Sequence, residues 1–266
     1  MSAPVFVLGG IQSDFARNLA RKAMDLSDLT KEVVEGALAD CALHAKAIDA
    51  VHVGNAFGEL FTGQAQLGAM PATVVPALVN VPSSRHEAAC ASGSIAVLSA
   101  MRDIEAGHAD CVLVVGVEQQ RNVSGEVMAR YLGSAAWVGH EGGDARFMWP
   151  HLFSRVADEV ADRYGLQHAH LAAIAKKNIA NAKRNPLAQT RGWQFTDASF
   201  TEDDEANPIV EGRLRRHDCG QVTDGGAAVV LASAKFAEAW AKKNTRSLDK
   251  LARFVGWGHR AAGLGL

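Results

Sequence analysis

The spacing of apolar residues along the first 117 positions predicts strands that alternate with helices. Short apolar runs at 5–11, 50–56 and 111–117 are typical of buried strands. Apolar residues over 29–41 form one stripe at helical spacing, and 91–106 is small or apolar on most faces, which predicts a buried helix. This alternation predicts a layered α/β fold.

The pattern changes after Val117. Residues 118–150 carry Gly, His, Trp and charged side chains without clear periodicity, which is typical of loops. Helical stripes follow over 153–164 and 171–182, and an apolar run typical of a strand returns at 227–232. The middle of the chain therefore has the pattern of a mostly helical insertion in an α/β core.

We expect three domains or parts of domains along the sequence. Residues 1–117 and 221–248 are expected to form the α/β domain, 118–220 an inserted loop domain, and 249–266 the start of a second domain that the printed chain does not contain. The last expectation depends on Leu251–Trp257, which has strand character, because a lone strand cannot satisfy its edges or bury its faces.

Composition and charge narrow the class of protein. The 266 residues carry a formal net charge of −2 with both signs interspersed, which argues against a nucleic-acid partner or an anionic membrane surface. No apolar run reaches the roughly 20 residues of a membrane span, and the first residues lack the features of a signal peptide. The four cysteines are far apart and form no CxxC pair, so we expect a reducing cytoplasm. His86, Glu87, His140 and His151 lack metal-ligand spacing, so we expect no metal.

The candidate chemistry centres on Cys90, which lies between an extended segment (83–89) and the helix expected at 91–106. The partial positive charge of a helix N-terminus stabilises a thiolate, and its free N–H groups can bind an oxyanion. Ala91, Ser92 and Gly93 leave room for an acyl group. The pattern suits a nucleophile that becomes acylated. The alternative is that Cys90 is a small buried hydrophobe, the role expected of Cys41 and Cys111.

Four segments in order resemble the amino-terminal half of thiolases. They are Glu87-Ala88-Ala89-Cys90-Ala91-Ser92-Gly93-Ser94, Val112–Glu118 with its Gly-x-Glu ending, Val222-Thr223-Asp224-Gly225-Gly226-Ala227-Ala228, and the early Val53-Gly54-Asn55 with Gly63-Gln64. They lie between residues 53 and 228 of the printed sequence, in the order that the family has them. The Trp257-Gly258-His259 ending is similar to the sterol-carrier-protein-x-like, lipid-transfer branch.

The resemblance implies a fold and an activity. The fold would be one half of a five-layer sandwich, a layered α/β/α core with a helical loop domain inserted. The activity would be acyl transfer in lipid and fatty acid metabolism: Cys90 takes an acyl group from a 3-ketoacyl-CoA or acetyl-CoA, and CoA or a second thioester accepts it. No cofactor is bound permanently, since the coenzyme A thioester is the substrate. Homodimers or tetramers are expected by the same resemblance.

The acid/base residues of thiolases are missing from the printed chain. The family places an activating His in a Gly-His-Pro run and a second Cys in a Cys-x-Gly run, both in the carboxy-terminal half. Gly258-His259-Arg260 lacks the Pro and comes too early. We therefore expect little turnover without a carboxy-terminal half or a partner subunit that supplies the proton transfers.

Four residues are candidates for contact with CoA. By the thiolase resemblance, Leu152 and Phe153 take the place of a family His-Met pair that contacts pantetheine, and Cys219 and Gly220 take the place of an Ala-Ser pair. Arg213 belongs to a basic cluster that could bind the CoA phosphates. The alternatives are that Phe153 packs in a helix core and that the arginines are solvated surface residues.

Three hypotheses follow for function. The first is an acyl-CoA C-acyltransferase, or thiolase, that forms or cleaves 3-ketoacyl-CoA through an acyl-cysteine. The second is a non-catalytic, thiolase-like carrier of acyl chains or lipids. The third is an unrelated cysteine hydrolase with His86 as its base.

Overall fold

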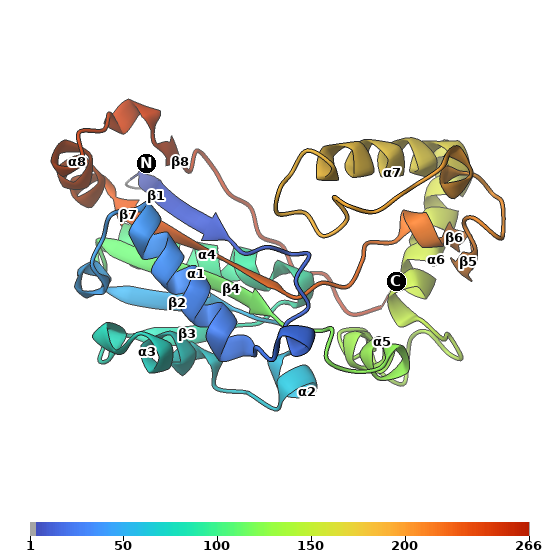
Figure 1. The fold of residues 1–266 in the computed structure, drawn as a ribbon, viewed down its shortest axis with the longest axis horizontal. Helices are drawn as coiled ribbons and strands as arrows, with labels where there is room; N and C mark the ends of the chain where they lie inside the picture. The colour runs from blue at the N-terminus through green and yellow to red at the C-terminus, as the bar shows by residue number, and fades with distance from the viewer. Residues whose placement is uncertain (1–3, 266) are drawn as a thin grey trace. The chain divides into compact units, whose positions relative to one another are not determined.

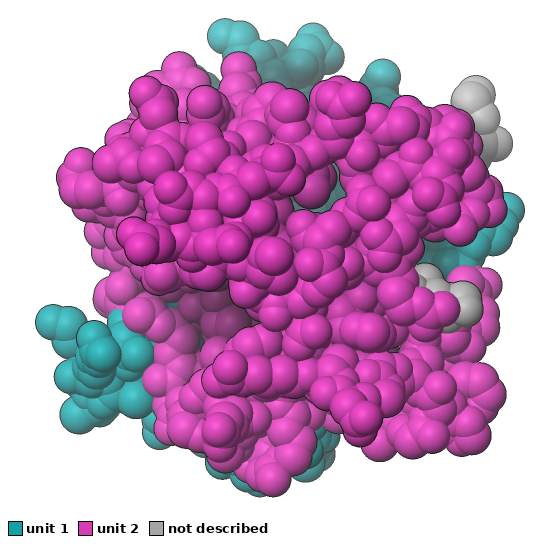
Figure 2. Space-filling model, turned by 90° about the vertical axis from the view of Figure 1, so that its right-hand side faces the viewer, with its two compact units in different colours: residues 1–13, 18–119, 224–260 teal, residues 14–17, 120–223, 261–266 magenta. Residues whose placement is uncertain are grey.

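The computed structural model describes residues 4–265, and their contacts divide the chain into two compact units. Unit 1 comprises the described residues of 1–13, 18–119 and 224–260. Unit 2 comprises the described residues of 14–17, 120–223 and 261–266, and Figure 2 colours the two units separately. The predicted domain boundaries stay a prediction.

Unit 1 is built on a six-stranded sheet. The strands, in spatial order, are β3 (Ser83–His86), β2 (Ala50–Gly54), β4 (Cys111–Glu118), β7 (Gly225–Ser233), β1 (Val5–Gln12) and β8 (Ala252–Arg253). β2 lies between β3 and β4 and is parallel to both, whereas β7 is antiparallel to β4 and β1. The three parallel strands therefore end at the same edge of the sheet.

Helices cover both faces of this sheet, and the alternation of side chains along the strands explains why. Val51, Val53 and Leu113 share one apolar core with α1 (Leu26–Asp40) and α8 (Ala234–Lys243). The intervening residues Ala50 and Val112 share a second core with α4 (Ser92–Glu105). Figure 1 shows α1 crossing the strands. The expected layered α/β/α core is confirmed.

Two segments of unit 1 differ from the sequence expectations. The strand expected over 83–89 ends at His86, and Ala89–Ala91 forms a turn of 3₁₀ helix instead. The strand expected at Leu251–Trp257 is only Ala252–Arg253, and it pairs with the outer edge of β1. That segment has a partner strand within unit 1, and its assignment to a second domain stays a prediction.

The core under β4 should dominate the stability of unit 1. Leu113 is fully buried, and Leu113→Ala is expected to lower the free energy of unfolding by about 2–5 kcal/mol because it leaves a cavity. Leu60→Ala is the matched control, since Leu60 is 40% exposed and its loss should cost much less. Urea denaturation followed by circular dichroism measures both. Equal shifts in the two variants would contradict this account of the core.

Unit 2 is mostly helical. Its elements are α5 (Gly125–Gly133), α6 (Met148–Tyr164), α7 (His168–Ala182) and the hairpin β5 (Ile209–Glu211) with β6 (Leu214–Arg215). α6 packs against α5 and against both hairpin strands. The expectation of loops throughout 118–150 was wrong for α5. The missed signal was Ser124, whose hydroxyl caps the helix, followed by an apolar stripe that includes Met128 and Leu132.

Candidate functional site

Cys90 lies just beyond the shared carboxyl edge of the parallel strands. β2 ends at Gly54, β3 ends at His86, and β4 ends at Glu118, and Cys90 follows β3 by four residues along the chain. Ligands of open α/β sheets bind at the carboxyl ends of strands, where the loops of neighbouring strands meet. Cys90 therefore has the position of a site residue in this architecture.

The turn that carries Cys90 is strained and held in place. Ala89 has a φ of +48°, in the left-handed region that a residue with a Cβ adopts at a cost of roughly 1 kcal/mol or more. Its N–H donates to Glu87 Oε1 at 2.5 Å, and its carbonyl accepts from Ser92 Oγ at 2.7 Å. Ser92 Oγ also accepts from the N–H of Ala88 at 2.9 Å. Side chains on both sides of Cys90 thus fix a conformation that the backbone alone disfavours.

The start of α4 offers uncapped N–H groups beside Cys90. The cap residue, Ala91, has no side chain that can accept from the first turn of this 14-residue helix. Nothing lies within 4 Å of the place where a Cβ would stand on Gly93. On the sheet side, a Cβ on Gly54 would lie 2.8 Å from the backbone of Gly93, so the glycine lets β2 approach the helix start closely. The turn is therefore open on one side and tightly supported on the other.

The four thiols have different surroundings. Cys90 is exposed, whereas Cys41 and Cys111 are buried and Cys219 is partly buried. Burial raises the pKa of Cys41 to about 12, and burial also raises the pKa of Cys111. The packing roles predicted for Cys41 and Cys111 agree with these positions. The alternative of a buried, inert Cys90 does not agree with its exposure.

Motif residues of the two neighbouring strands tie their ends together. Asn55 Nδ2 donates to the carbonyl of Val117 at 2.7 Å, and Asn55 Oδ1 accepts from Gly58 at 2.9 Å. Glu118 Oε1 accepts from the N–H groups of Ala56 and Phe57 at 2.7 and 3.1 Å. These side chains brace the edge of the sheet at which Cys90 lies.

His86 does not serve the thiol as a base in this arrangement. Its ring nitrogens lie 2.8 Å from His52 Nδ1, 3.0 Å from Ser84 Oγ and 3.4 Å from Ser99 Oγ. Among the hydrogen bonds of residues 4–265, none joins His86 to Cys90. The hypothesis of a cysteine hydrolase that uses His86 therefore lacks its central contact.

The surroundings of His86 predict a loss of stability in acid. Burial, and then the neighbouring His52, hold the pKa of His86 below its ordinary value of 6.5. The unfolded chain consequently binds this proton more readily, and the contribution to stability is complete above pH 6.5 and falls as the pH drops through the lowered pKa. His86→Gln should reduce the loss of stability between about pH 7 and pH 5, measured by urea midpoints. The prediction would be contradicted if the urea midpoint fell by the same amount between the two pH values in His86→Gln and in the unchanged protein.

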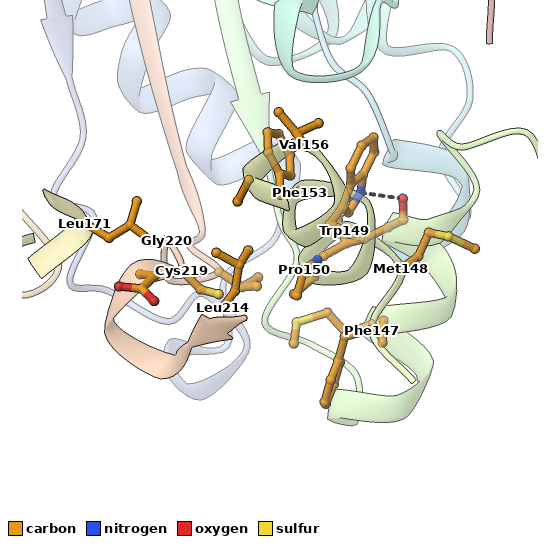
Figure 3. A pocket seen from close by; sticks show the side chains of 16 residues that line it. Phe147, Met148, Trp149, Pro150, Phe153, Val156, Leu171, Leu214, Cys219 and Gly220 are labelled. Atoms are coloured by element: carbon orange, nitrogen blue, oxygen red, sulfur yellow. Dashed lines mark hydrogen bonds between the residues drawn. The ribbon is translucent and has the colours of Figure 1, made fainter. Parts of the chain in front are cut away.

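Unit 2 contains an apolar pocket of about 580 Å³. α5, α6, α7 and the segment from 214 to 222 form its walls. Figure 3 shows Phe147, Met148 and Trp149 on one side of the view and Leu171, Cys219 and Gly220 on the other. The lining residues are Met128, Ala129, Leu132, Phe147, Met148, Trp149, Pro150, Phe153, Val156, Ala157, Leu171, Leu214, Asp218, Cys219, Gly220 and Val222.

Two hydrogen bonds involve side chains that line this pocket. Trp149 Nε1 donates to the carbonyl of Leu132 at 2.8 Å, which joins α6 to α5 (Figure 3). Asp218 contributes the one acidic side chain, and its Oδ2 accepts from the N–H of Arg215. A pocket of this size and polarity suits an apolar ligand such as an acyl chain.

Three of the four predicted CoA-contact residues line this pocket. Phe153 is 58% exposed there, which disagrees with a place in a helix core. Cys219 and Gly220 line the opposite wall, and burial followed by the Asp218 charge raises the pKa of the Cys219 thiol, which keeps it protonated. Arg213 is different: it lies outside the lining, and its Nε contacts Asp158 Oδ1 at 2.6 Å.

Sequence reasoning missed part of the pocket and misjudged the basic cluster. The missed part of the pocket is formed by Phe147, Met148 and Trp149, which lie at the start of α6. The large apolar side chains in this run were the signal that could have predicted a pocket wall. Arg215 is nearly buried, and its guanidinium contacts Asp204 and the carbonyl of Asn207. The ion pairs of Arg213 and Arg215 within unit 2 give these arginines structural partners.

In residues 4–265, no group of three or more His, Cys, Asp or Glu side chains could hold a metal ion. In the same part of the chain, no helix has both the length and the apolar character needed to span a bilayer.

The fold is a layered α/β core, and its candidate site is an exposed cysteine at a strained strand-to-helix turn. The sequence model of the family described as "Thiolase, N-terminal domain" matches residues 5–235. The chain belongs to the thiolase family, as its resemblance predicted.

Curated relatives match most of this chain but only part of their own length. The chain is 31% identical over 236 residues to an acetyl-CoA acetyltransferase of Methanothermobacter thermautotrophicus, a match that covers 88% of this chain and 58% of the relative. It is 29% identical over 241 residues to human sterol carrier protein 2, covering 88% of this chain and 42% of the relative. The chain thus spans about half the length of these relatives.

Solved structures share the fold at low sequence identity. An Ltp2-ChsH2(DUF35) aldolase matches with a TM-score of 0.67 and 20% identity over 94% of this chain and 58% of that chain. Human mitochondrial 3-ketoacyl-CoA thiolase in complex with CoA matches with a TM-score of 0.63 and 18% identity over 92% of this chain and 67% of that chain. These similarities concern the fold alone.

Proposed function

We propose that this chain is the nucleophile-bearing part of an acyl-CoA C-acyltransferase that forms or cleaves 3-ketoacyl-CoA through an acyl-Cys90 intermediate. The observation that carries the proposal is the exposed thiol of Cys90, placed in a strained turn at the uncapped start of α4. Membership of the thiolase family and the name of the archaeal relative, acetyl-CoA acetyltransferase, support the same chemistry.

The first step would be attack by the Cys90 thiolate on the carbonyl carbon of an acyl-CoA thioester. A bond forms between Sγ and that carbon, and the negative charge moves to the carbonyl oxygen, where N–H groups at the start of α4 can donate to it. The carbon–sulfur bond to CoA then breaks, and the CoA thiolate takes up a proton. The products are acyl-Cys90 and free CoA.

The proton transfers need groups beyond those around Cys90. Formation of the thiolate releases a proton, and formation of a carbon–carbon bond requires a base that removes a proton from the second thioester. His86 is bonded to other partners, so we assign these roles to a carboxy-terminal half or a partner subunit. Self-association and a reducing cytoplasm belong to the same proposal.

The coenzyme A thioester would be a substrate, with no cofactor bound permanently. The apolar pocket of unit 2, with Phe153, Cys219 and Gly220 in its lining, suits the acyl or pantetheine portion. Arg213 stays a candidate for the CoA phosphates, but it would have to exchange its partner Asp158 for them.

Intact-mass analysis tests the proposal directly. The purified chain is incubated with acetyl-CoA or acetoacetyl-CoA, and peptide mapping then locates any adduct. A gain of one acyl group on Cys90 would support the nucleophile. No adduct from either thioester, with a folded protein, would count against acyl transfer by this chain.

The second candidate is an acyl or lipid carrier without catalysis. It is favoured by the apolar pocket in unit 2 and by relatives named sterol carrier protein 2 and non-specific lipid-transfer protein-like 2. Reversible binding of a fluorescent fatty acid, together with no covalent adduct, is the outcome expected of a carrier. Rapid acylation of Cys90 followed by transfer to an acceptor would exclude it.

A further inference from the structure

Three titratable side chains of unit 1 form a hydrogen-bonded chain between the sheet and α4. His52 of β2 is 8% exposed, and its Nε2 lies 2.8 Å from Asp103 Oδ2 on α4. Its Nδ1 lies 2.8 Å from Nε2 of His86, the last residue of β3. The order along the chain of hydrogen bonds is therefore Asp103, His52, His86.

Apart from the hydroxyls of Ser84 and Ser99, the residues around His52 in this layer are mostly apolar. The neighbours of His52 on the same side of the sheet include Ala50, Val112 and Val114, and α4 contributes Met101 and Ile104 to the same core. A polar group in such a place is costly unless it is hydrogen-bonded. The close contacts among Asp103, His52 and His86 satisfy that requirement, so the three side chains depend on one another.

The partners of each nitrogen define where protons sit. With Asp103 ionised, His52 donates from Nε2, and its Nδ1 accepts from the Nε2–H of His86. Ser84 Oγ lies 3.2 Å from the same Nδ1 of His52 and 3.0 Å from Nε2 of His86, so its hydroxyl can also donate to His52. The remaining nitrogen, Nδ1 of His86, lies 3.4 Å from Ser99 Oγ, which can donate to it. One further proton can enter at this nitrogen, because the serine oxygen can then accept, but two adjacent imidazolium ions would repel each other strongly.

The other charged side chains close in sequence to Asp103 and His86 contact other partners. Arg85 alternates to the opposite face of β3 and forms an ion pair with Glu59. Glu87 accepts from the N–H of Ala89, and the Arg102 guanidinium lies over the Trp257 ring at 5.7 Å. The residues of β4 that face α4, such as Val112 and Val114, are uncharged. Asp103 is therefore the carboxylate that faces the histidine pair in the described part of unit 1.

We propose that Asp103, His52 and His86 form a proton-sharing positioning device for the Cys90 turn. The device clamps the end of β3 to α4, and the turn with Ala89 and Cys90 follows directly. With Asp103 ionised, uptake of one proton changes the net charge of the three side chains from −1 to 0, and a less negative charge would favour a thiolate at Cys90, which follows His86 by four residues. The proposal concerns the reactivity of the thiol and does not require acyl transfer.

The test is the rate at which iodoacetamide alkylates Cys90, resolved by peptide mass spectrometry between about pH 5 and pH 9, either side of the ordinary histidine pKa. In the unchanged protein, the logarithm of the rate should fall with a slope below one where the pair takes up its proton. His86→Gln keeps a hydrogen-bonding group at the same reach but cannot titrate. It should restore a slope of one and keep the alkaline rate within about twofold, because the clamp survives.

Two further variants separate the clamp from the charge. His86→Leu removes the hydrogen bonds and should slow alkylation about threefold or more across the whole pH range, the scale of one lost hydrogen bond. Asp103→Asn removes the charge but keeps an acceptor for His52, and should move the inflection to lower pH. His108→Gln is the matched control because His108 is exposed, and it should leave the profile unchanged.

The outcomes are decisive in both directions. A His86→Gln profile identical to that of the unchanged protein would overturn the role of the shared proton. Alkylation of His86→Leu at the original rate would overturn the clamp. Near-ultraviolet circular dichroism of each variant establishes that it is folded. If His86→Leu does not fold, Ser99→Ala tests the same series of hydrogen bonds at its His86 end. Ser99→Ala should shift the inflection, because it removes the acceptor of the added proton, and an unchanged inflection would count against the device.

Discussion

Cys90→Ser should abolish the covalent acyl adduct, with a loss of at least about 100-fold in the rate of acylation by acetyl-CoA. The serine has nearly the same size and can keep the turn, but its hydroxyl is a much weaker nucleophile without an adjacent base. The supports of the turn, Glu87 and Ser92, are unchanged in this variant. Intact-mass analysis over time after addition of acetyl-CoA measures the effect.

Cys219→Ser is the matched control for that experiment. Cys219 is partly buried, and its raised thiol pKa keeps it protonated, so Cys219→Ser should still form the covalent adduct at Cys90, although its place in the pocket lining can change the affinity for the thioester. An adduct that peptide mapping locates on Cys219 of Cys90→Ser, or loss of the adduct in Cys219→Ser alone, would place the nucleophile in unit 2 and contradict the assignment.

Filling the apolar pocket of unit 2 should have the second largest effect. Val156 lines the pocket and is 39% exposed, so Val156→Trp places a large side chain in open space with little disturbance of the core. Each excluded CH₂ group of a ligand loses about 0.8 kcal/mol, and exclusion of two groups corresponds to about a tenfold weaker binding. Long-chain acyl ligands should therefore bind at least about tenfold more weakly.

Val138→Trp is the control for pocket filling. Val138 is also an exposed valine of unit 2, but it is absent from the lining of this pocket. Titration with a fluorescent fatty acid measures both variants, and acetylation of Cys90 by acetyl-CoA should continue in each. Equal affinity of Val156→Trp and the unchanged protein would show that the acyl chain binds elsewhere.

The site features that sequence reasoning found are local ones. The strand of 83–86, the turn at Cys90 and the helix that follows it are specified by consecutive residues, whose pattern of small and apolar side chains carries the information. Phe153 and Cys219 were expected to contact CoA because of the thiolase resemblance, and both line one pocket. The strand, turn and helix around Cys90 depend on neighbouring residues, so they can be recognised without knowledge of the tertiary structure.

The sequence pattern did not predict the partners of side chains that contact residues far away in the sequence. Arg213 was a candidate for phosphate contact, but its partner is Asp158, which lies 55 positions earlier on α6. A basic cluster looks the same in a sequence whether it is free or paired. Its role depends on which carboxylate the fold brings within reach.

The sequence by itself determined the strand and helix pattern of the α/β core, the thiolase resemblance and the choice of Cys90 as the candidate nucleophile. Only the tertiary structure decided that Ala89 takes a left-handed conformation and that His52, His86 and Asp103 form one hydrogen-bonded chain. Those three residues come from β2, β3 and α4, and no periodicity links their positions. They meet because parallel strands pair in register and one helix crosses the same face of the sheet.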